Sequence, residues 1–216
     1  TTVIEEYKPV AVKEISKNGK TSYVLDYGQN MQGFVRLDTQ GKAGVSYLIE
    51  YSELVEDNGD IRPVTTAHCP TSTYTLSGGE DHFQPRFFYT GFRYVKVSGI
   101  TDEQATEELL TYLVYHTELD TYGDFSCSDE TVNQLQEMTR RSILSNFHHF
   151  PTDCPQREKN GWTADAALTC EAALLNFDPE RNYREWMRNI CKAQREDGAL
   201  PGIVPTCGWG FDWGNG

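Results

Sequence analysis

The alternation of hydrophobic and polar positions divides the chain into two halves with different periods. Up to about residue 118, short runs rich in β-branched and aromatic residues are separated by turn signals such as Lys17-Asn18-Gly19 and Asp57-Asn58-Gly59. Many short strands with this punctuation are typical of an antiparallel β-sandwich. The predicted strands lie at residues 23–27, 33–37, 45–51, 73–76, 92–97 and 109–116.

From about residue 128 the apolar positions follow a helical period. Ser128 is a suitable N-cap, and apolar side chains recur at helical spacing from Val132 to Phe147, until two prolines force a loop. A second helix is predicted from near Thr163 to Phe177, and a third follows Asp178-Pro179 and ends before Asp197-Gly198. Three helices rarely form a domain alone, so the pattern indicates the opening part of a larger α-helical domain.

Composition excludes several classes of partner. The 216 residues carry a formal net charge of -13 and include 38% hydrophobic residues, so a buried core is expected and a nucleic-acid phosphate backbone is not. No run of Lys and Arg indicates an anionic membrane, and no apolar stretch approaches the roughly 20 residues that span a bilayer. We therefore expect neither a nucleic-acid partner nor a membrane partner.

Cysteine usage and the first residue bear on processing and compartment. Six cysteines occur without any CxxC spacing, which favours structural thiols over a zinc framework or a dense disulfide scaffold. Residue 1 is Thr rather than Met, and no basic-then-apolar leader precedes the strands. We expect the N-terminus to be either processed or an internal cut, and the sequence assigns no compartment.

The residues with the clearest chemistry lie between Phe150 and Asp165. Within 13 positions this segment places three carboxylates, an arginine and a tryptophan on a loop that enters a helix. Glycoside hydrolysis needs a proton donor at the leaving oxygen and carboxylates that hold sugar hydroxyls or stabilise positive charge. Crowded carboxylates resist simultaneous ionisation, which would keep a proton on Glu158. The residue types therefore fit an acid site that binds a pyranose.

Other interpretations of the same residues compete with this one. Acidic residues before a helix are usually solvated or act as caps, and a tryptophan beside glycine is usually core. The β half would suit a non-catalytic carbohydrate-binding module if its tyrosines stacked on sugars, although their strand spacing favours burial. A metal site is a further alternative, but adjacent histidines on a helix point about 100° apart. The residues concerned are Tyr23, Tyr47 and Tyr74 for the module, and His148, His149, Cys154 and Cys170 for the metal.

The sequence of the acidic segment resembles the signature of glycoside hydrolase family 78, the bacterial α-L-rhamnosidases. That family's signature reads approximately Asp-Cys-Pro-Gln-Arg, acid, Gly-Trp, Thr-Gly-Asp, and residues 153–165 reproduce nearly all of it. Residues 26–33 and 87–95 look like β-domain motifs of the family, and residues 212–216 look like a loop over its active site. The resemblance covers almost the whole chain in the correct order.

The resemblance implies an inverting hydrolase of terminal α-L-rhamnose, with an (α/α)6 barrel preceded by β-sandwich domains. Residues 1–118 would be the β-sandwich, and residues 119–216 the N-terminal part of the six-hairpin catalytic domain. Rhamnose-containing glycosides or plant polysaccharides would be the partners, and no cofactor or metal is expected. By position Glu158 takes the role of general acid, while the rhamnose subsite corresponds to Asp153, Arg157, Trp162, Asp165 and Trp213.

The chain departs from the family pattern at positions that affect this assignment of roles. Ala164 stands where the family usually has Gly, and some members have one extra residue before the acid, so Glu158 is assigned by counting back from Gly161-Trp162. An inverting enzyme also needs a second carboxylate as base. In the family this glutamate comes from a later part of the barrel, and Glu171 is more readily explained as structural. We expect the base to lie beyond Gly216, and the chain alone to be a truncated, inactive piece.

Overall fold

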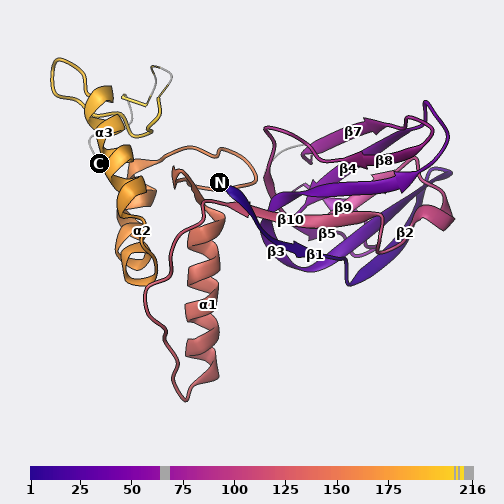
Figure 1. Ribbon diagram of the computed structural model, residues 1–216, viewed down its shortest axis with the longest axis horizontal. Coiled ribbons are helices and arrows are strands. Elements are labelled where there is room, and N and C mark those ends of the chain that lie inside the picture. The colour runs from indigo at the N-terminus through magenta and orange to yellow at the C-terminus, as the bar shows by residue number, and fades with distance from the viewer. Residues whose placement is uncertain (64–68, 207, 209, 212–216) are drawn as a thin grey trace. The chain divides into compact units, whose positions relative to one another are not determined.

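The computed structural model describes residues 1–63, 69–206, 208, 210 and 211. These residues form two compact units, one of residues 3–115 and the other of residues 116 onward together with residues 1 and 2 (Figure 1). The first unit is built of antiparallel strands and the second mainly of helices, as the two periods in the sequence predict. The expected fold class, antiparallel β structure followed by the first helices of a helical domain, is confirmed.

The first unit is a curled antiparallel sheet. Its main path runs in the order β1-β10-β3-β9-β4-β7, and β2 and β8 both pair with β3. A short hairpin of β5 and β6 stands apart from this sheet, and a 3-10 helix covers residues 102–104. The strand bounds are β1 Thr2–Tyr7, β2 Ala11–Lys17, β3 Lys20–Gln40, β4 Ser46–Ser52, β5 Leu54–Val55, β6 Ile61–Arg62, β7 Thr71–Thr75, β8 Glu80–Phe83, β9 Thr90–Ser98 and β10 Leu110–His116.

Strand β3 joins two runs that the pattern predicts as separate strands. Its first half pairs with β2 and β9, and its second half pairs with β9, β10 and β8. The register with β9 shifts between Asp26 and Met31. Gly28 has a positive φ of 81° at this irregularity, a conformation that glycine adopts without strain. At Gly33 a Cβ atom would lie 1.9 Å from the carbonyl oxygen of Leu113. Both glycines of the first β-domain motif are therefore explained by backbone geometry.

The core of this unit is aromatic. The rings of Phe92 and Tyr112 stack with centroids 4.0 Å apart, and Tyr27 meets Tyr112 edge-on at 5.1 Å. Tyr23 and Tyr47 are 5% and 0% exposed, which confirms burial rather than sugar stacking as the reason for their strand spacing. Tyr74 stacks on Phe83 and donates a hydrogen bond to Asp81. No sugar platform of tyrosines forms from these three residues.

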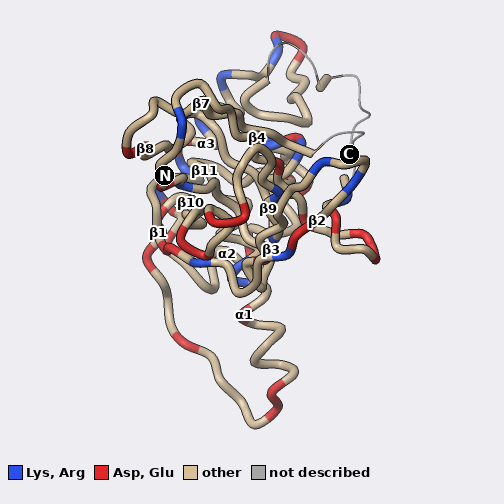
Figure 2. The backbone as a smooth tube through the Cα atoms, turned by 90° about the vertical axis from the view of Figure 1, so that its right-hand side faces the viewer, with Lys and Arg blue, Asp and Glu red and all other residues tan. Residues whose placement is uncertain are grey.

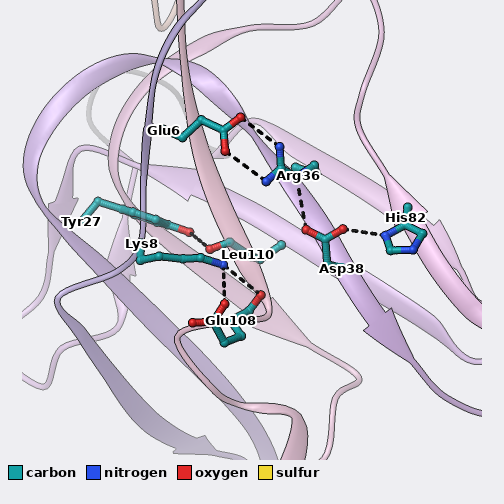
Figure 3. A network of polar contacts seen from close by, with 8 residues as sticks. All are labelled: Glu6, Lys8, Tyr27, Arg36, Asp38, His82, Glu108 and Leu110. Carbon is teal, nitrogen blue, oxygen red and sulfur yellow. Dashed lines mark hydrogen bonds and ion pairs between the residues drawn. The ribbon is translucent and has the colours of Figure 1, made fainter.

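A polar network lies across strands β1, β3, β8 and β10 (Figure 3). Arg36 makes a bidentate contact with Glu6 at 3.0 and 3.1 Å, and it also donates to Asp38 at 3.2 Å. Asp38 in turn lies 2.7 Å from Nδ1 of His82. The network is partly exposed, and such surface ion pairs contribute modestly to stability. Acidic and basic positions are interspersed along the backbone, with acidic residues in the majority (Figure 2).

The two β-domain motifs meet at an ion pair between Asp26 and Arg93. Nε and Nη2 of Arg93 donate to the two carboxylate oxygens at 2.7 and 2.8 Å, and the N–H of Gly28 donates to Oδ1 at 2.7 Å. The hydrogen bonds from Arg93 are the main reason that the pKa of Asp26 is lowered from its ordinary value of 3.8, against the opposing effect of burial. The pair therefore stabilises the fold only while Asp26 is ionised.

This pair predicts a pH-dependent loss of stability. Because the folded-state pKa of Asp26 is below the unfolded value, its contribution is present above about pH 4 and is lost as the pH falls through the folded-state pKa. We expect Asp26→Asn to lower the free energy of unfolding by about 1 kcal/mol at pH 7, a value reduced for the partial exposure of Arg93, and by less at pH 3. Urea unfolding followed by far-UV circular dichroism measures both values. The exposed Asp57, changed to Asn, is the control, and an Asp26→Asn effect of equal size at both pH values would contradict the prediction.

The second unit contains three helices: α1 (Glu130–Ser145), α2 (Thr163–Asn176) and α3 (Glu180–Ala193). The predicted N-cap of the first is wrong by one residue, because the side chain of Asp129, not Ser128, accepts the N–H of Thr131. The helix also ends earlier than its apolar stripe. Phe147 lies in a short hairpin of β11 (Phe147–His148) and β12 (Phe150–Pro151), where His149 has a positive φ of 69°.

The first part of the apolar stripe of α1 is not covered by the described residues, whereas Ile143 and Leu144 near its end are half-buried. Leu135 and Met138 are 62% and 66% exposed, and α1 has no buried residue within the described chain. In contrast, Ala173 of α2 and Trp186 of α3 are buried. None of the helices in the described part of the chain is long and apolar enough to cross a membrane.

Candidate functional site

The acidic segment forms a closed loop between β12 and α2. The N–H of Asp153 donates to the carbonyl of Asn160 at 3.0 Å, and the N–H of Asn160 donates back to Oδ1 of Asp153 at 2.8 Å. Within this ring, the N–H of Lys159 donates to the carbonyl of Cys154 at 3.2 Å. Lys159 itself has a positive φ of 58°, which is unusual for a residue with a long side chain. The loop is therefore held by its own backbone and by the Asp153 carboxylate.

Both oxygens of the Glu158 carboxylate accept hydrogen bonds. Nη2 of Arg157 donates to Oε1 at 2.6 Å, and the indole Nε1–H of Trp162 donates to Oε2 at 2.9 Å. The Glu158 side chain is 31% exposed, so a ligand can reach it, while Arg157 is more exposed at 48%. The structure thus brings together three of the predicted site residues in one cluster.

The position of Trp162 depends on a second segment that the sequence did not indicate. Trp162 forms an isolated antiparallel bridge with Ile203, the N–H of Val204 donates to the carbonyl of Gly161 at 2.9 Å, and the N–H of Thr163 donates to the carbonyl of Gly202 at 2.9 Å. The carbonyl of Val204 also accepts the indole N–H of the buried Trp186 at 2.7 Å. This segment ties the loop to α3.

The pairing of residues 161–163 with residues 202–204 requires glycine at position 161. A Cβ atom at this position would lie 2.0 Å from the carbonyl oxygen of Val204 and 3.1 Å from the ring of Phe150. Gly161 is buried, and its φ is not positive, so close packing and not a left-handed conformation explains the residue. The Gly-Trp pair of the motif is thereby explained: glycine lets the two backbones pair, and the pairing orients the indole.

Asp153 and Asp165 line a cavity to which none of Arg157, Glu158 and Trp162 contributes. The cavity, of about 240 Å³, is lined by both carboxylates together with residues from α1, α2 and α3. Asp165 is exposed on the first turn of α2, whereas Asp153 is half-buried and also accepts the thiol of Cys154 at 3.0 Å. Among the described residues, neither the buried Oδ1 of Asn146 nor the hydroxyl of Tyr183, which line the same cavity, has a hydrogen-bond partner. Such atoms normally find a partner in water or a ligand.

The predicted site residues thus form two groups, Glu158 with Arg157 and Trp162, and Asp153 with Asp165, instead of one cluster of carboxylates. Donors, not carboxylates, contact Glu158, and Asp153 is engaged in closing the loop. Trp213 lies outside the described residues. Sequence reasoning placed Cys154 in the loop without assigning its thiol a role there, and it missed Asn146, Tyr183 and residues 202–204 as parts of the site. The only sequence signal for a role of the Cys154 thiol is its position between Asp153 and Pro155 in the motif.

Burial changes the ionisation of several neighbouring groups. Burial raises the pKa of the Cys154 thiol, and the hydrogen bond to Asp153 acts in the same direction. Burial also lowers the pKa of the Lys159 ammonium. His148 is buried, and this desolvation lowers its pKa to about 4, so its imidazole is neutral at neutral pH. Its Nε2 lies 3.2 Å from the carbonyl of Ser145. In the part of the chain that the structure describes, no three His, Cys, Asp or Glu residues are grouped to hold a metal ion.

Comparisons with known proteins agree with the resemblance in the motifs. A family model described as the bacterial alpha-L-rhamnosidase concanavalin-like domain matches residues 16–115. A second, described as the bacterial alpha-L-rhamnosidase 6 hairpin glycosidase domain, matches residues 120–215. The two matches lie side by side along the chain and include both β-domain motifs and the acidic loop.

Individual relatives are similar over nearly the whole chain. An alpha-L-rhamnosidase of Formosa agariphila is 32% identical over 87% of the chain, and one of Streptomyces avermitilis is 32% identical over 97%. The solved structure of alpha-L-rhamnosidase from Dictyoglumus thermophilum superposes on 94% of the chain with a TM-score of 0.85 and 34% identity. The matched part is 23% of that structure's chain. The structure of the Streptomyces avermitilis enzyme complexed with L-rhamnose gives a TM-score of 0.84 at 32% identity over 95% of the chain.

The chain spans about a fifth of the length of the curated relatives, 20% in each of these two cases. Its similarity therefore concerns one contiguous part of them, in which a β domain is followed by the start of a helical domain. Family models on both units, relatives that match nearly the whole chain and a closely superposing fold all agree. The chain belongs to the bacterial α-L-rhamnosidase family.

Proposed function

We propose that this chain supplies the acid side of an inverting hydrolysis of terminal non-reducing α-L-rhamnose residues, carried out by the full-length protein. Residues 1–118 would serve as its β-domain, and residues 119–216 as the first part of its catalytic domain. The observation that carries the proposal is the Glu158 carboxylate, accessible to ligands and held between the donors Arg157 and Trp162 within the family motif. In this role Glu158 donates a proton to the glycosidic oxygen as the bond to the sugar breaks.

In the proposed step, Glu158 releases one of its two partners as it delivers its proton. The indole of Trp162 is fixed by the backbone pairing with residues 202–204, whereas Arg157 is nearly half exposed on a long side chain. Arg157 is therefore the partner that moves. Its guanidinium would turn from Oε1 toward a sugar hydroxyl, which leaves Oε1 free to carry the proton to the leaving oxygen. Trp162 would keep Oε2 in place throughout.

Sugar binding is assigned to the remaining motif residues. Asp153 and Asp165 line a cavity together with Asn146 and Tyr183, each of which has a buried polar atom without a hydrogen-bond partner among the described residues, and this polarity suits sugar hydroxyls. Trp162 offers an apolar ring face to the C–H groups of a deoxy sugar, and Trp213 is assigned to the same subsite from the resemblance. The relative solved with L-rhamnose supports this choice of sugar.

The base of the reaction is assigned to a part of the catalytic domain outside this chain. An inverting enzyme places the base about 6.5–9.5 Å from the acid, with room for a water molecule. Glu171, the nearby alternative, is exposed on α2, and a structural role suffices for it. The proposal accordingly assigns the chain an acid and a sugar subsite but no complete catalytic pair.

This division predicts opposite results for the full-length protein and the 216-residue chain. We expect the full-length protein to release L-rhamnose from an aryl α-L-rhamnoside, with the β anomer formed first in proton NMR spectra because the reaction inverts the anomeric carbon. The isolated chain should release none above background. Release of the α anomer by the full-length protein would contradict inversion, and turnover by the isolated chain would contradict the missing base.

A further inference from the structure

The thiol of Cys154 connects the two ends of the acidic loop. Its Sγ–H donates to Oδ2 of Asp153 at 3.0 Å, and the N–H of Glu158 donates to the same sulfur at 3.4 Å. We infer that Cys154 is a positioning residue for Glu158, acting through the backbone of the acid and the carboxylate of Asp153. This inference rests on the proposed role of Glu158 as general acid.

The contacts of Cys154 come from both its side chain and its backbone. Besides the two contacts of the thiol, its carbonyl accepts the N–H of Lys159 at 3.2 Å. Glu158 and Lys159 are thus both tied to Cys154, just where Lys159 adopts its left-handed conformation. The left-handed conformation is costly for a residue with a Cβ atom, so Lys159 would leave it if the loop relaxed. The backbone beside the acid would then change, and the Glu158 side chain would point elsewhere.

A protonated thiol is what this arrangement needs. The sulfur donates to a carboxylate, and only the S–H form can do so. Burial and the neighbouring Asp153 raise the pKa of the thiol, so the donor is retained at neutral pH. A thiolate here would repel Asp153 and would loosen the link between the two ends of the loop.

The other described cysteines do not make comparable contacts with the acidic loop. The thiol of Cys170 donates to the carbonyl of Ala167 within its own helix at 3.3 Å. Cys191 is exposed on α3, and Cys127 donates to the carbonyl of Asp129 at the start of α1. Cys191 therefore provides a matched control, a thiol in the same unit that does not touch the loop.

The test compares two substrates in the full-length protein. A displaced general acid slows departure of a poor leaving group, such as methanol, far more than that of 2,4-dinitrophenolate, which leaves without a proton. We expect Cys154→Ala to lower kcat on the methyl rhamnoside by roughly 10- to 100-fold, with a much smaller loss on the dinitrophenyl rhamnoside and little change in KM. Cys154→Ser, which keeps a donor and an acceptor, should recover most of the loss.

The controls separate this inference from a general loss of folding and from failure of the proposed function. Cys191→Ala should behave as the unsubstituted protein on both substrates. If Cys154→Ala does not fold, Cys154→Val, which fills the volume without hydrogen bonding, replaces it on the same two substrates. Equal losses on the two substrates, or no loss, overturn the role of Cys154. If Glu158→Gln itself leaves turnover of the methyl rhamnoside unchanged, the proposed acid is wrong, and the inference is overturned with it.

Discussion

Glu158→Gln in the full-length protein is expected to lower kcat on methyl α-L-rhamnoside by about 1000-fold. Glutamine preserves the shape of the side chain and can still accept from Arg157 or Trp162, but it has no proton to give to the leaving oxygen. The loss on the dinitrophenyl rhamnoside should be far smaller, because that leaving group needs no proton. Steady-state kinetics on both substrates measure the contrast.

A control variant completes this test. Glu171→Gln, an equivalent change on the exposed face of α2, should leave kcat within about twofold of the unsubstituted value. A loss in Glu171→Gln as large as that in Glu158→Gln would instead point to Glu171 as a catalytic group.

Gly161→Ala is expected to destabilise the helical unit by about 3 kcal/mol. The added methyl carbon would lie 2.0 Å from the Val204 carbonyl oxygen, which is backbone and cannot rotate away, and 3.1 Å from the Phe150 ring. Relief requires the pairing between residues 161–163 and 202–204 to open. The same opening would release Trp162 from its place beside Glu158, so activity of the full-length protein should fall as well.

Tryptophan fluorescence measures this change, because all four tryptophans follow residue 118 and therefore report on the helical unit. Gly202→Ala is the matched control. Its added Cβ would meet its nearest neighbour, the carbonyl oxygen of Gly210, at an ordinary 3.5 Å, and the Trp162 ring at 3.7 Å. It should change the free energy of unfolding by less than about 0.5 kcal/mol. If the two variants unfold at the same urea concentration, the close approach at Gly161 is not what constrains this residue.

Local patterns in the sequence determined much of the fold. Periodicity located the strands and helices because side-chain spacing repeats every two residues in a strand and every 3.6 in a helix. The wording of residues 153–165 identified the family, since that series of residue types is specific to it. Even Asn18-Gly19 was readable as a turn, and both residues have positive φ in the structure.

Periodicity did not predict the strand bounds or the burial that depend on contacts between residues distant in sequence. Tyr23–Tyr27 and Gly33–Leu37 read as two strands, but pairing with β9 on both sides of the irregularity makes them one. The helical stripe of α1 predicted a buried face, yet Leu135 and Met138 remain exposed in the described chain. Burial depends on what packs against a helix, and the helix's own sequence does not contain that information.

The site divides in the same way. The sequence by itself determined which residue types are available for acid chemistry: Glu158 with Arg157, Trp162, Asp153 and Asp165. Tertiary structure alone decided that donors contact Glu158, that Asp153 closes the loop with Asn160 and the Cys154 thiol, and that residues 202–204 orient Trp162. The physical reason is that hydrogen-bond partners depend on distances of about 3 Å in space, and a residue some 40 positions away reaches such a distance only after the chain has folded.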